Sequence, residues 1–311
     1  MDLLEDSKMR RKGRQVSFVF FTIVLLVSFI CAPKTYCASQ KSFLWKVRSP
    51  SATVYLLGSV HFMRREIYPL PREIEEAFDQ SNVLVVEANV TDIGKLDLEK
   101  LTEKAFYPED DGLVKHVSSS TYELIKKETA KFGLPLEIVN RQRPWLLSLT
   151  LEALELIGLG MDPSYGIDYH FLSKAEGKKK ILELESFDYQ IDLLSGLSGD
   201  DQELLILYTL KDFSKIRPKV DQLIKAWKSG DEEGMQSIAT SETREDWRFS
   251  SIYEKIVSDR NRSMAGKIEE FLRTGETYFV VAGVAHLIGE KGIVELLRGR
   301  GYPVEGVLVS R

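Results

Sequence analysis

The sequence has few cysteines and few histidines. Its 311 residues include two cysteines and four histidines, and both cysteines, Cys31 and Cys37, lie in the first 38 residues. Beyond that segment a disulfide framework and a cysteine nucleophile are excluded, so any metal must be held by His, Asp or Glu. No stretch rich in proline, glycine or serine divides the remainder, which predicts one domain over residues 39–311.

Several short catalytic signatures are also missing. The sequence contains no H-E-x-x-H pair of a zinc protease and no G-x-S-x-G elbow of a serine hydrolase. It has no glycine-rich phosphate loop either. The sequence therefore indicates none of these three kinds of site.

The first 38 residues differ from the rest. Basic residues at 10–14 precede an uncharged apolar run over 16–31, and small residues follow around Ala38. This order predicts a secretory signal peptide over residues 1–38. The apolar run is shorter than the roughly 20 residues of a membrane span, and an uncleaved N-terminal membrane anchor over 16–31 is the alternative. We expect an exported protein, periplasmic or extracellular, that meets a membrane only through this segment.

The charge of the remaining chain is negative. Six of the 42 basic and three of the 47 acidic residues lie in 1–38, which leaves 36 basic and 44 acidic residues, a net charge of −8. An acidic exported domain lacks the basic face that nucleic acid requires. A peptide or small-molecule substrate is the expected partner, and the oligomeric state is left open.

The apolar pattern predicts an α/β fold. Two β-prone runs, Ser42–Val47 and Thr53–Leu57, flank Pro50 and form a hairpin pattern. A helix from Arg72 to Phe78 and a strand over 82–89 then suggest a parallel βαβ unit. Further strands are expected at Ile181–Glu185, Thr277–Val281 and Val304–Val309. Because the middle of the chain is mostly helical, we predict a mixed, mostly parallel central sheet with flanking helices and a large helical middle section.

One local pattern occurs twice. Gly58-Ser59-Val60-His61 follows the strand that starts at Thr53, and Gly283-Val284-Ala285-His286 follows the strand that starts at Thr277. Glycine permits a sharp turn where a strand leaves the sheet, and ligands of open α/β sheets bind at those strand ends. Two of the four histidines in matching contexts favour a shared site.

Carboxylates end two other predicted strands, at Glu87 and Glu185. Two imidazoles with one or two carboxylates match a hydrolytic divalent-metal site, for which zinc, manganese, cobalt and iron are all suitable ions. Glu87 would ligate the metal or act as the general base. The alternatives are that Glu87 caps the sheet in solvent and that the histidines close the strand ends by hydrogen bonds alone.

Four further residues are candidates for the pocket. Arg143 stands at a helix entrance beside Trp145, and the alternative is that Trp145 is core and Arg143 pairs with a surface acid. Arg260 opens a later helix, from which it could reach a bound carboxylate or phosphate. Asp168 and His170 lie on one predicted helix. Asp168 shares a face with Phe171 while His170 points elsewhere, which argues against both ligating one ion.

Together these segments resemble the TraB/GumN family, which includes the Tiki proteins. The matching residues are Tyr55–His61, Val85–Asn89, Arg143–Trp145, Gly166–Phe171, Leu184–Ser186 with Gln190, Arg260–Asn261 and Val281–Leu287 with Gly289. The resemblance implies an erythromycin-esterase-like and ChaN-like (EreA/ChaN-like) α/β fold. It also implies a protease dependent on manganese or cobalt, with His61, Glu87 and His286 as the metal site.

The sequence thus predicts an exported, divalent-metal-dependent hydrolase that acts on peptides. His61 and His286 would hold manganese, cobalt or zinc, and Glu87 would ligate or serve as base. The residues expected to shape the pocket or orient the ligands are Arg143, Asp168, His170, Glu185 and Arg260. The alternative is a non-catalytic protein that binds a peptide or small ligand in the same crevice.

Overall fold

The computed structural model describes residues 39–310 except 90, 93–96 and 214. The predicted signal peptide or anchor, residues 1–38, lies outside the described residues and stays a prediction. Among the helices of the described part, none has the length and apolar character needed to cross a membrane.

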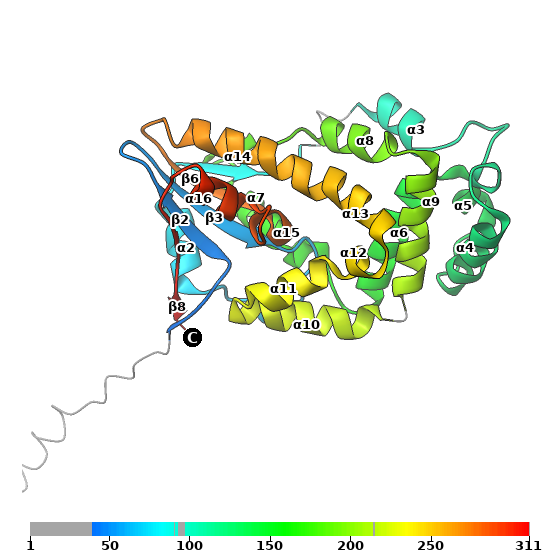
Figure 1. The fold of residues 1–311 in the computed structure, drawn as a ribbon, viewed down its shortest axis with the longest axis horizontal. Helices are drawn as coiled ribbons and strands as arrows, with labels where there is room; N and C mark the ends of the chain where they lie inside the picture. Colours follow the sequence, from blue (N-terminus) through cyan, green and yellow to red (C-terminus); the bar gives the residue numbers. More distant parts are fainter. Residues whose placement is uncertain (1–38, 90, 93–96, 214, 311) are drawn as a thin grey trace, which may run out of the picture. The chain divides into compact units, whose positions relative to one another are not determined.

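A six-stranded sheet forms the centre of the fold (Figure 1). Its strands are β2 (Leu44–Arg48), β3 (Thr53–Ser59), β4 (Val83–Val86), β5 (Lys180–Glu183), β6 (Thr277–Gly283) and β7 (Val304–Gly306), in the order β5-β4-β6-β3-β2-β7. Neighbours among β5, β4, β6 and β3 pair in parallel, while β2 is antiparallel to β3 and β7. The mixed, mostly parallel sheet and the N-terminal hairpin are therefore confirmed.

Two details of the topology differ from the prediction. Strands β3 and β4 are parallel but not adjacent, because β6, whose residues 278–282 are all buried, lies between them. The single strand expected over Val304–Val309 is two strands. β7 pairs with β2, whereas β8 (Val309–Ser310) pairs with β1 (Ser39–Gln40). Between the two strands, the amide of Val307 donates to the carbonyl of Leu44, the first residue of β2.

The helices begin and end at recognisable signals. Ser118 accepts a hydrogen bond from the Thr121 amide at the start of α4, Pro144 occupies the first turn of α6, and Gly230 ends α10 with φ of 62°. The α-helices are α2 (Arg72–Asp79), α3 (Leu98–Ala105), α4 (Ser119–Lys131), α5 (Leu136–Arg141), α6 (Pro144–Gly158), α7 (Ile167–Ala175), α8 (Phe187–Ser195), α9 (Gly199–Asp212), α10 (Ile216–Ser229), α11 (Glu232–Ala239), α12 (Ser241–Glu245), α13 (Trp247–Tyr253), α14 (Asp259–Phe271), α15 (Val284–Leu287) and α16 (Ile293–Gly299). A π-helix, η5 (Glu254–Ser258), joins α13 to α14.

Helices cover both faces of the sheet. On one face Phe78 of α2 and Phe171 of α7 pack against Phe279 of β6, with ring centroids 4.8 to 5.6 Å apart. The preceding residue of β6, Tyr278, points to the opposite face and stacks on Phe271 of α14. These two aromatic layers bury the sheet and fix where its strand ends lie.

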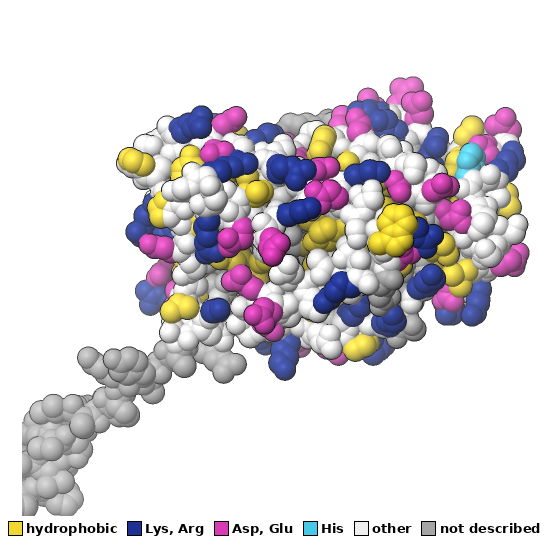
Figure 2. Space-filling view, in the orientation of Figure 1, with side chains coloured by type: hydrophobic (Ala, Val, Ile, Leu, Met, Phe, Trp, Pro, Cys, Tyr) yellow, Lys and Arg dark blue, Asp and Glu magenta, His cyan; other side chains and the backbone are white. Residues whose placement is uncertain are grey.

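The helical middle section has a core of its own. Its buried side chains come from α4, α5, α6 and α9 and from the segment before α4: Tyr107, Leu113, Ile125, Val139, Leu147, Leu151, Ile206 and Leu210. These helices lie at the right of Figure 1, beyond the carboxyl ends of the parallel strands. Figure 2 shows basic and acidic side chains interspersed over the visible face, with small apolar patches between them.

Candidate functional site

The parallel strands β3, β6 and β4 end at one edge of the sheet. Ser59 pairs with Gly283, and Val86 pairs with Val281. In parallel sheets this edge is where ligands bind. His61, Glu87 and His286 follow the three strands, so the topology brings together residues separated by as many as 225 positions in the sequence.

A cavity of about 360 Å³ opens at this edge. Its polar lining consists of Ser59, His61, Glu87, Asp168 and Gln190. The apolar lining comes from the strand ends, from α7 and from the segment before it: Phe62, Val86, Ala88, Pro163, Tyr169 and Val281. The cavity thus combines ionisable groups with an apolar floor, as ligand sites commonly do.

Gly283 marks the point where the three predicted ligands converge. A Cβ placed on this glycine would lie 3.1 Å from Oε1 of Glu87, 3.5 Å from Cδ2 of His286 and 4.0 Å from Nε2 of His61. Because glycine has no side chain, this space stays open between them. Nε2 of His286 is also 3.7 Å from Oε2 of Glu87.

Both histidine rings are held through their Nδ1 atoms. His61 Nδ1 is 3.0 Å from Oδ1 of Asp168, and His286 Nδ1 is 2.6 Å from Oδ1 of Asn261. The Asn261 amide is oriented because its Nδ2 donates to the carbonyl of Lys291. In the neutral form of each ring the proton is therefore on Nδ1, and Nε2 is a lone-pair donor directed to the Glu87 side.

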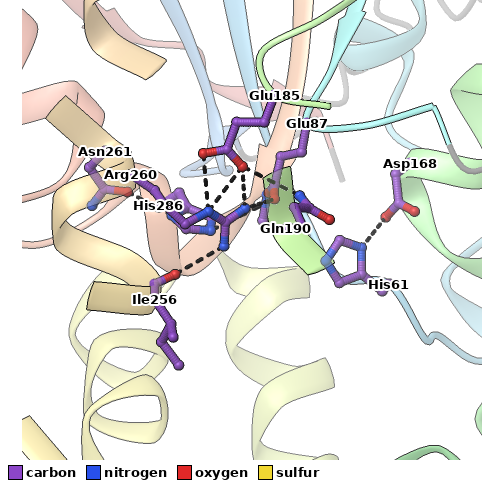
Figure 3. Close-up of polar contacts among 10 residues, drawn as sticks. His61, Glu87, Asp168, Glu185, Gln190, Ile256, Arg260, Asn261 and His286 are labelled. Carbon is purple, nitrogen blue, oxygen red and sulfur yellow. Dashed lines mark hydrogen bonds and ion pairs between the residues drawn. The ribbon is translucent and has the colours of Figure 1, made fainter. Parts of the chain in front are cut away.

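Arg260 holds the carboxylates in place (Figure 3). Its Nη2 is 2.7 Å from Oε2 of Glu185 and 2.9 Å from Oε2 of Glu87, and its Nη1 donates to the carbonyl of Ile256. The other oxygen of Glu87 accepts from the Gly283 amide. Buried carboxylates need such partners, so the guanidinium defines the orientation of both.

Burial and charge shift the pKa values of these groups. Burial opposes ionisation of Glu87, but the positive charges of the facing histidines and Arg260 and the Gly283 amide outweigh it and lower its pKa to about 2. Burial lowers the pKa of His286. For His61, desolvation at the cavity is overcome by the hydrogen bond and charge of Asp168, and the pKa rises to about 9. Glu87 is accordingly a carboxylate at neutral pH and a weak base.

The structure brings most of the predicted residues together. His61, Glu87 and Asp168 line the cavity, His286 and Arg260 contact Glu87, and Glu185 is buried against Arg260. As these side chains stand, no group of three His, Cys, Asp or Glu among the described residues is arranged closely enough to hold an ion. In this arrangement Glu87 is instead bonded to Arg260 and the Gly283 amide.

Two predicted residues lie elsewhere. The guanidinium of Arg143 lies over the ring of Tyr107, 5.0 Å from its centroid, beside the helical middle section. His170 bonds through Nε2 to Glu75 of α2 at 3.0 Å and packs on Tyr68. Neither lines the cavity. His170 points away because it lies two residues from Asp168 on α7, about 200° around a helix.

Sequence reasoning missed Asn261, Ser59 and the Gly283 amide as parts of the site. Asn261 directly follows Arg260, yet both side chains reach the site. Asn261 bonds to His286, and Arg260 bonds to the carboxylates. The π-helix η5 just before them is a feature that often occurs at functional sites. No periodic pattern in the sequence indicates this π-helix.

Fold and site define the protein class: an α/β protein with imidazole and carboxylate groups gathered at the carboxyl end of its parallel strands. The model of the TraB/PrgY/gumN family matches residues 43–306, so the chain belongs to this family. No solved structure matches the chain. The expected likeness to EreA/ChaN-like folds therefore stays a prediction.

Relatives extend along most of the chain. The uncharacterized protein YbaP of Escherichia coli (strain K12) is 26% identical over 247 residues, 78% of this chain and 87% of YbaP. Metalloprotease TIKI2 of Danio rerio is 22% identical, over 86% of this chain and 62% of its own length. Metalloprotease TIKI1 of Homo sapiens is 21% identical, over 90% of this chain and 65% of its own length. Distant relatives are thus named as metalloproteases.

Proposed function

We propose that this chain is an exported hydrolase that depends on a divalent metal ion and cleaves peptides. The observation that carries the proposal is the convergence of His61, Glu87 and His286 around the open side of Gly283. The names of the TIKI relatives support the reaction class. The predicted signal peptide supports export.

The donor chemistry fits a metal ion. Each imidazole is fixed through Nδ1 by an oxygen acceptor, the arrangement that orients histidine ligands in metal sites. Three carboxylates, those of Glu87, Glu185 and Asp168, and one guanidinium, that of Arg260, give the site a charge of −2 when both histidines are neutral. A divalent cation would balance this charge.

His61, His286 and Glu87 would hold the ion. When bound, a divalent ion polarises a carbonyl and makes hydroxide available near neutral pH. Asp168 and Asn261 keep the rings in place, and Arg260 keeps Glu87 ionised. Since a pKa of about 2 makes Glu87 a poor proton acceptor, the role of ligand suits it better than that of base.

A second candidate is a protein that binds a peptide or small ligand without turnover. It is favoured by one observation: both oxygens of Glu87 already accept hydrogen bonds, from Arg260 and from Gly283. Glu87→Gln separates the two functions. A hydrolase should lose turnover of peptide substrates, whereas a binding protein has no turnover to lose.

The first test is elemental analysis of the purified chain after loading with manganese, cobalt or zinc. The comparison is the double variant His61→Ala, His286→Ala, with His116→Ala as a control, since His116 bonds to Asp111 and stacks on Tyr107. We expect about one ion per parent and control chain and none in the double variant. Absence of metal in the parent under every loading contradicts the proposal.

A further inference from the structure

One polar side chain that lines the cavity bonds to none of the other site residues. Ser59, the second residue of the first G-x-x-H motif, is 2% exposed and lines the cavity. Within the described part of the chain, its Oγ has no hydrogen-bond partner. Because buried hydroxyls are almost always paired, an unpaired one that lines a cavity is free to bond to a ligand there.

The strand register places Ser59 beside the reactive centre. Ser59 of β3 pairs with Gly283 of β6 in parallel, so the two residues face the same side of the sheet. Neighbouring strands are about 4.8 Å apart. Ser59 is therefore one strand spacing from the glycine whose open side lies 3.1 Å from Glu87 Oε1 and 4.0 Å from His61 Nε2.

The surroundings of Ser59 argue against a nucleophile. An activated serine needs a base within hydrogen-bond reach, and no histidine or carboxylate of the described residues bonds to its Oγ. The Nδ1 atoms of His61 and His286 are taken by Asp168 and Asn261. The available chemistry of Ser59 is that of a neutral hydrogen-bond donor.

We propose that the Ser59 hydroxyl donates a hydrogen bond to the carbonyl oxygen of the scissile peptide bond as that oxygen becomes negative. This inference rests on the proposed function. Water adds to the carbonyl carbon, and the carbonyl π electrons move to the oxygen that Ser59 faces. Collapse then breaks the C–N bond, and a proton from the water ends on the leaving amine. Ser59 keeps its own proton throughout and contributes only in the charged transition state.

The test compares Ser59→Ala, Ser59→Thr and the control Ser81→Ala in the metal-loaded chain. Ser81 is also buried, but its Oγ donates to the Ala77 carbonyl. The readouts are kcat and KM for a peptide, the affinities for a tetrahedral phosphinic peptide and for the matching product peptide, and Tm.

We expect Ser59→Ala to lower kcat by about 10²-fold with KM nearly unchanged. Affinity for the phosphinic peptide should fall by a similar factor while product affinity stays the same. Ser59→Thr should keep both, since it retains the hydroxyl. Tm should fall in Ser81→Ala and not in Ser59→Ala, because Ser59 loses no internal hydrogen bond.

Three results overturn the proposal: unchanged kcat and phosphinic affinity in Ser59→Ala, equal losses of phosphinic and product affinity, or a Ser59→Thr variant as impaired as Ser59→Ala. If the metal-loaded parent neither cleaves peptides nor binds the phosphinic peptide, the proposed function itself fails. Measurements on the parent chain alone reveal that outcome, without any Ser59 variant. The proposed role of Ser59 is then overturned together with the proposed function.

Discussion

The two G-x-x-H motifs share a sequence pattern but differ in their surroundings. The side chain of His61 is 63% exposed and pairs with the carboxylate of Asp168. That of His286 is 8% exposed and bonds to the neutral amide of Asn261. Accordingly the pKa of His61 rises to about 9, whereas burial lowers that of His286. One motif supplies an accessible, charge-coupled imidazole and the other a buried, neutral one.

The glycines differ as well, because the register is offset by one residue. Gly58 pairs with Ala282, and Ser59 pairs with Gly283. A Cβ on Gly58 would meet Val284 Cγ2 at 3.0 Å and Phe43 Cβ at 3.1 Å, on the core side of the sheet. The first glycine therefore permits packing, while the second leaves space between the site residues.

The largest expected contrast is between His286→Ala and His61→Ala. Removing buried His286 leaves a cavity and an unpaired Oδ1 on Asn261, which should lower the free energy of unfolding by about 2–4 kcal/mol. Removing exposed His61 should lower it by less than about 1 kcal/mol. Urea unfolding of chelator-treated protein measures both. Equal losses would show that the two motifs are structurally equivalent.

Substitutions of the two glycines should have different effects, one on stability and the other on metal binding. Gly58→Ala should lower the free energy of unfolding by about 1–3 kcal/mol through overpacking. Gly283→Ala should leave stability within about 1 kcal/mol, because only the ends of side chains must move, and should abolish metal binding. Metal content and urea unfolding of each variant decide the matter. If the Gly283→Ala variant binds metal normally, the space beside Gly283 is not needed for metal binding.

Asp168→Asn tests the charge of the first motif. Because the pKa of His61 is raised, its pairing with Asp168 stabilises the metal-free fold fully at pH values below 6.5, the ordinary pKa of histidine. This stabilisation is lost as pH rises through about 9. The substitution should therefore destabilise the metal-free protein at pH 6 but not at pH 10. Because His61 is exposed, solvent screening keeps the effect below about 1 kcal/mol.

Metal titrations give an independent readout of the same variant. A histidine must lose its proton to ligate, so affinity in the parent should rise with pH up to about 9. Asp168→Asn should weaken binding by about 10–100-fold at high pH, where only ring orientation matters. At pH 6 the loss of metal affinity should be smaller, because without the Asp168 charge a smaller fraction of His61 is protonated and must lose its proton to bind the metal. A constant deficit across pH would contradict the charge coupling.

The smallest effect is expected for a histidine outside both motifs. His170 bonds to Glu75, whose pKa is lowered because hydrogen bonds from His170 and Lys174 outweigh its burial. His170→Ala should leave metal content unchanged and lower the free energy of unfolding by about 1 kcal/mol. Elemental analysis checks the first expectation. Loss of metal in this variant would place His170 in the site after all.

The sequence by itself determined which residues stand at the strand ends. Apolar runs that stop at Gly58, Val86 and Gly283 fix the strands, and His61, Glu87 and His286 follow within a few residues. The parallel arrangement of those strands then places all three at one edge. Local pattern suffices here because a strand has only two faces and one carboxyl end.

Only the tertiary structure decided which helical residues belong to the site. Arg143 and Arg260 both start helices, yet one lies on Tyr107 and the other bonds to Glu87. The one-residue register offset that leaves Ser59 beside Gly283 is equally invisible in the pattern. The physical reason is that the rotation of a helix and the register of two distant strands are set by packing between segments. A single sequence does not encode such contacts locally.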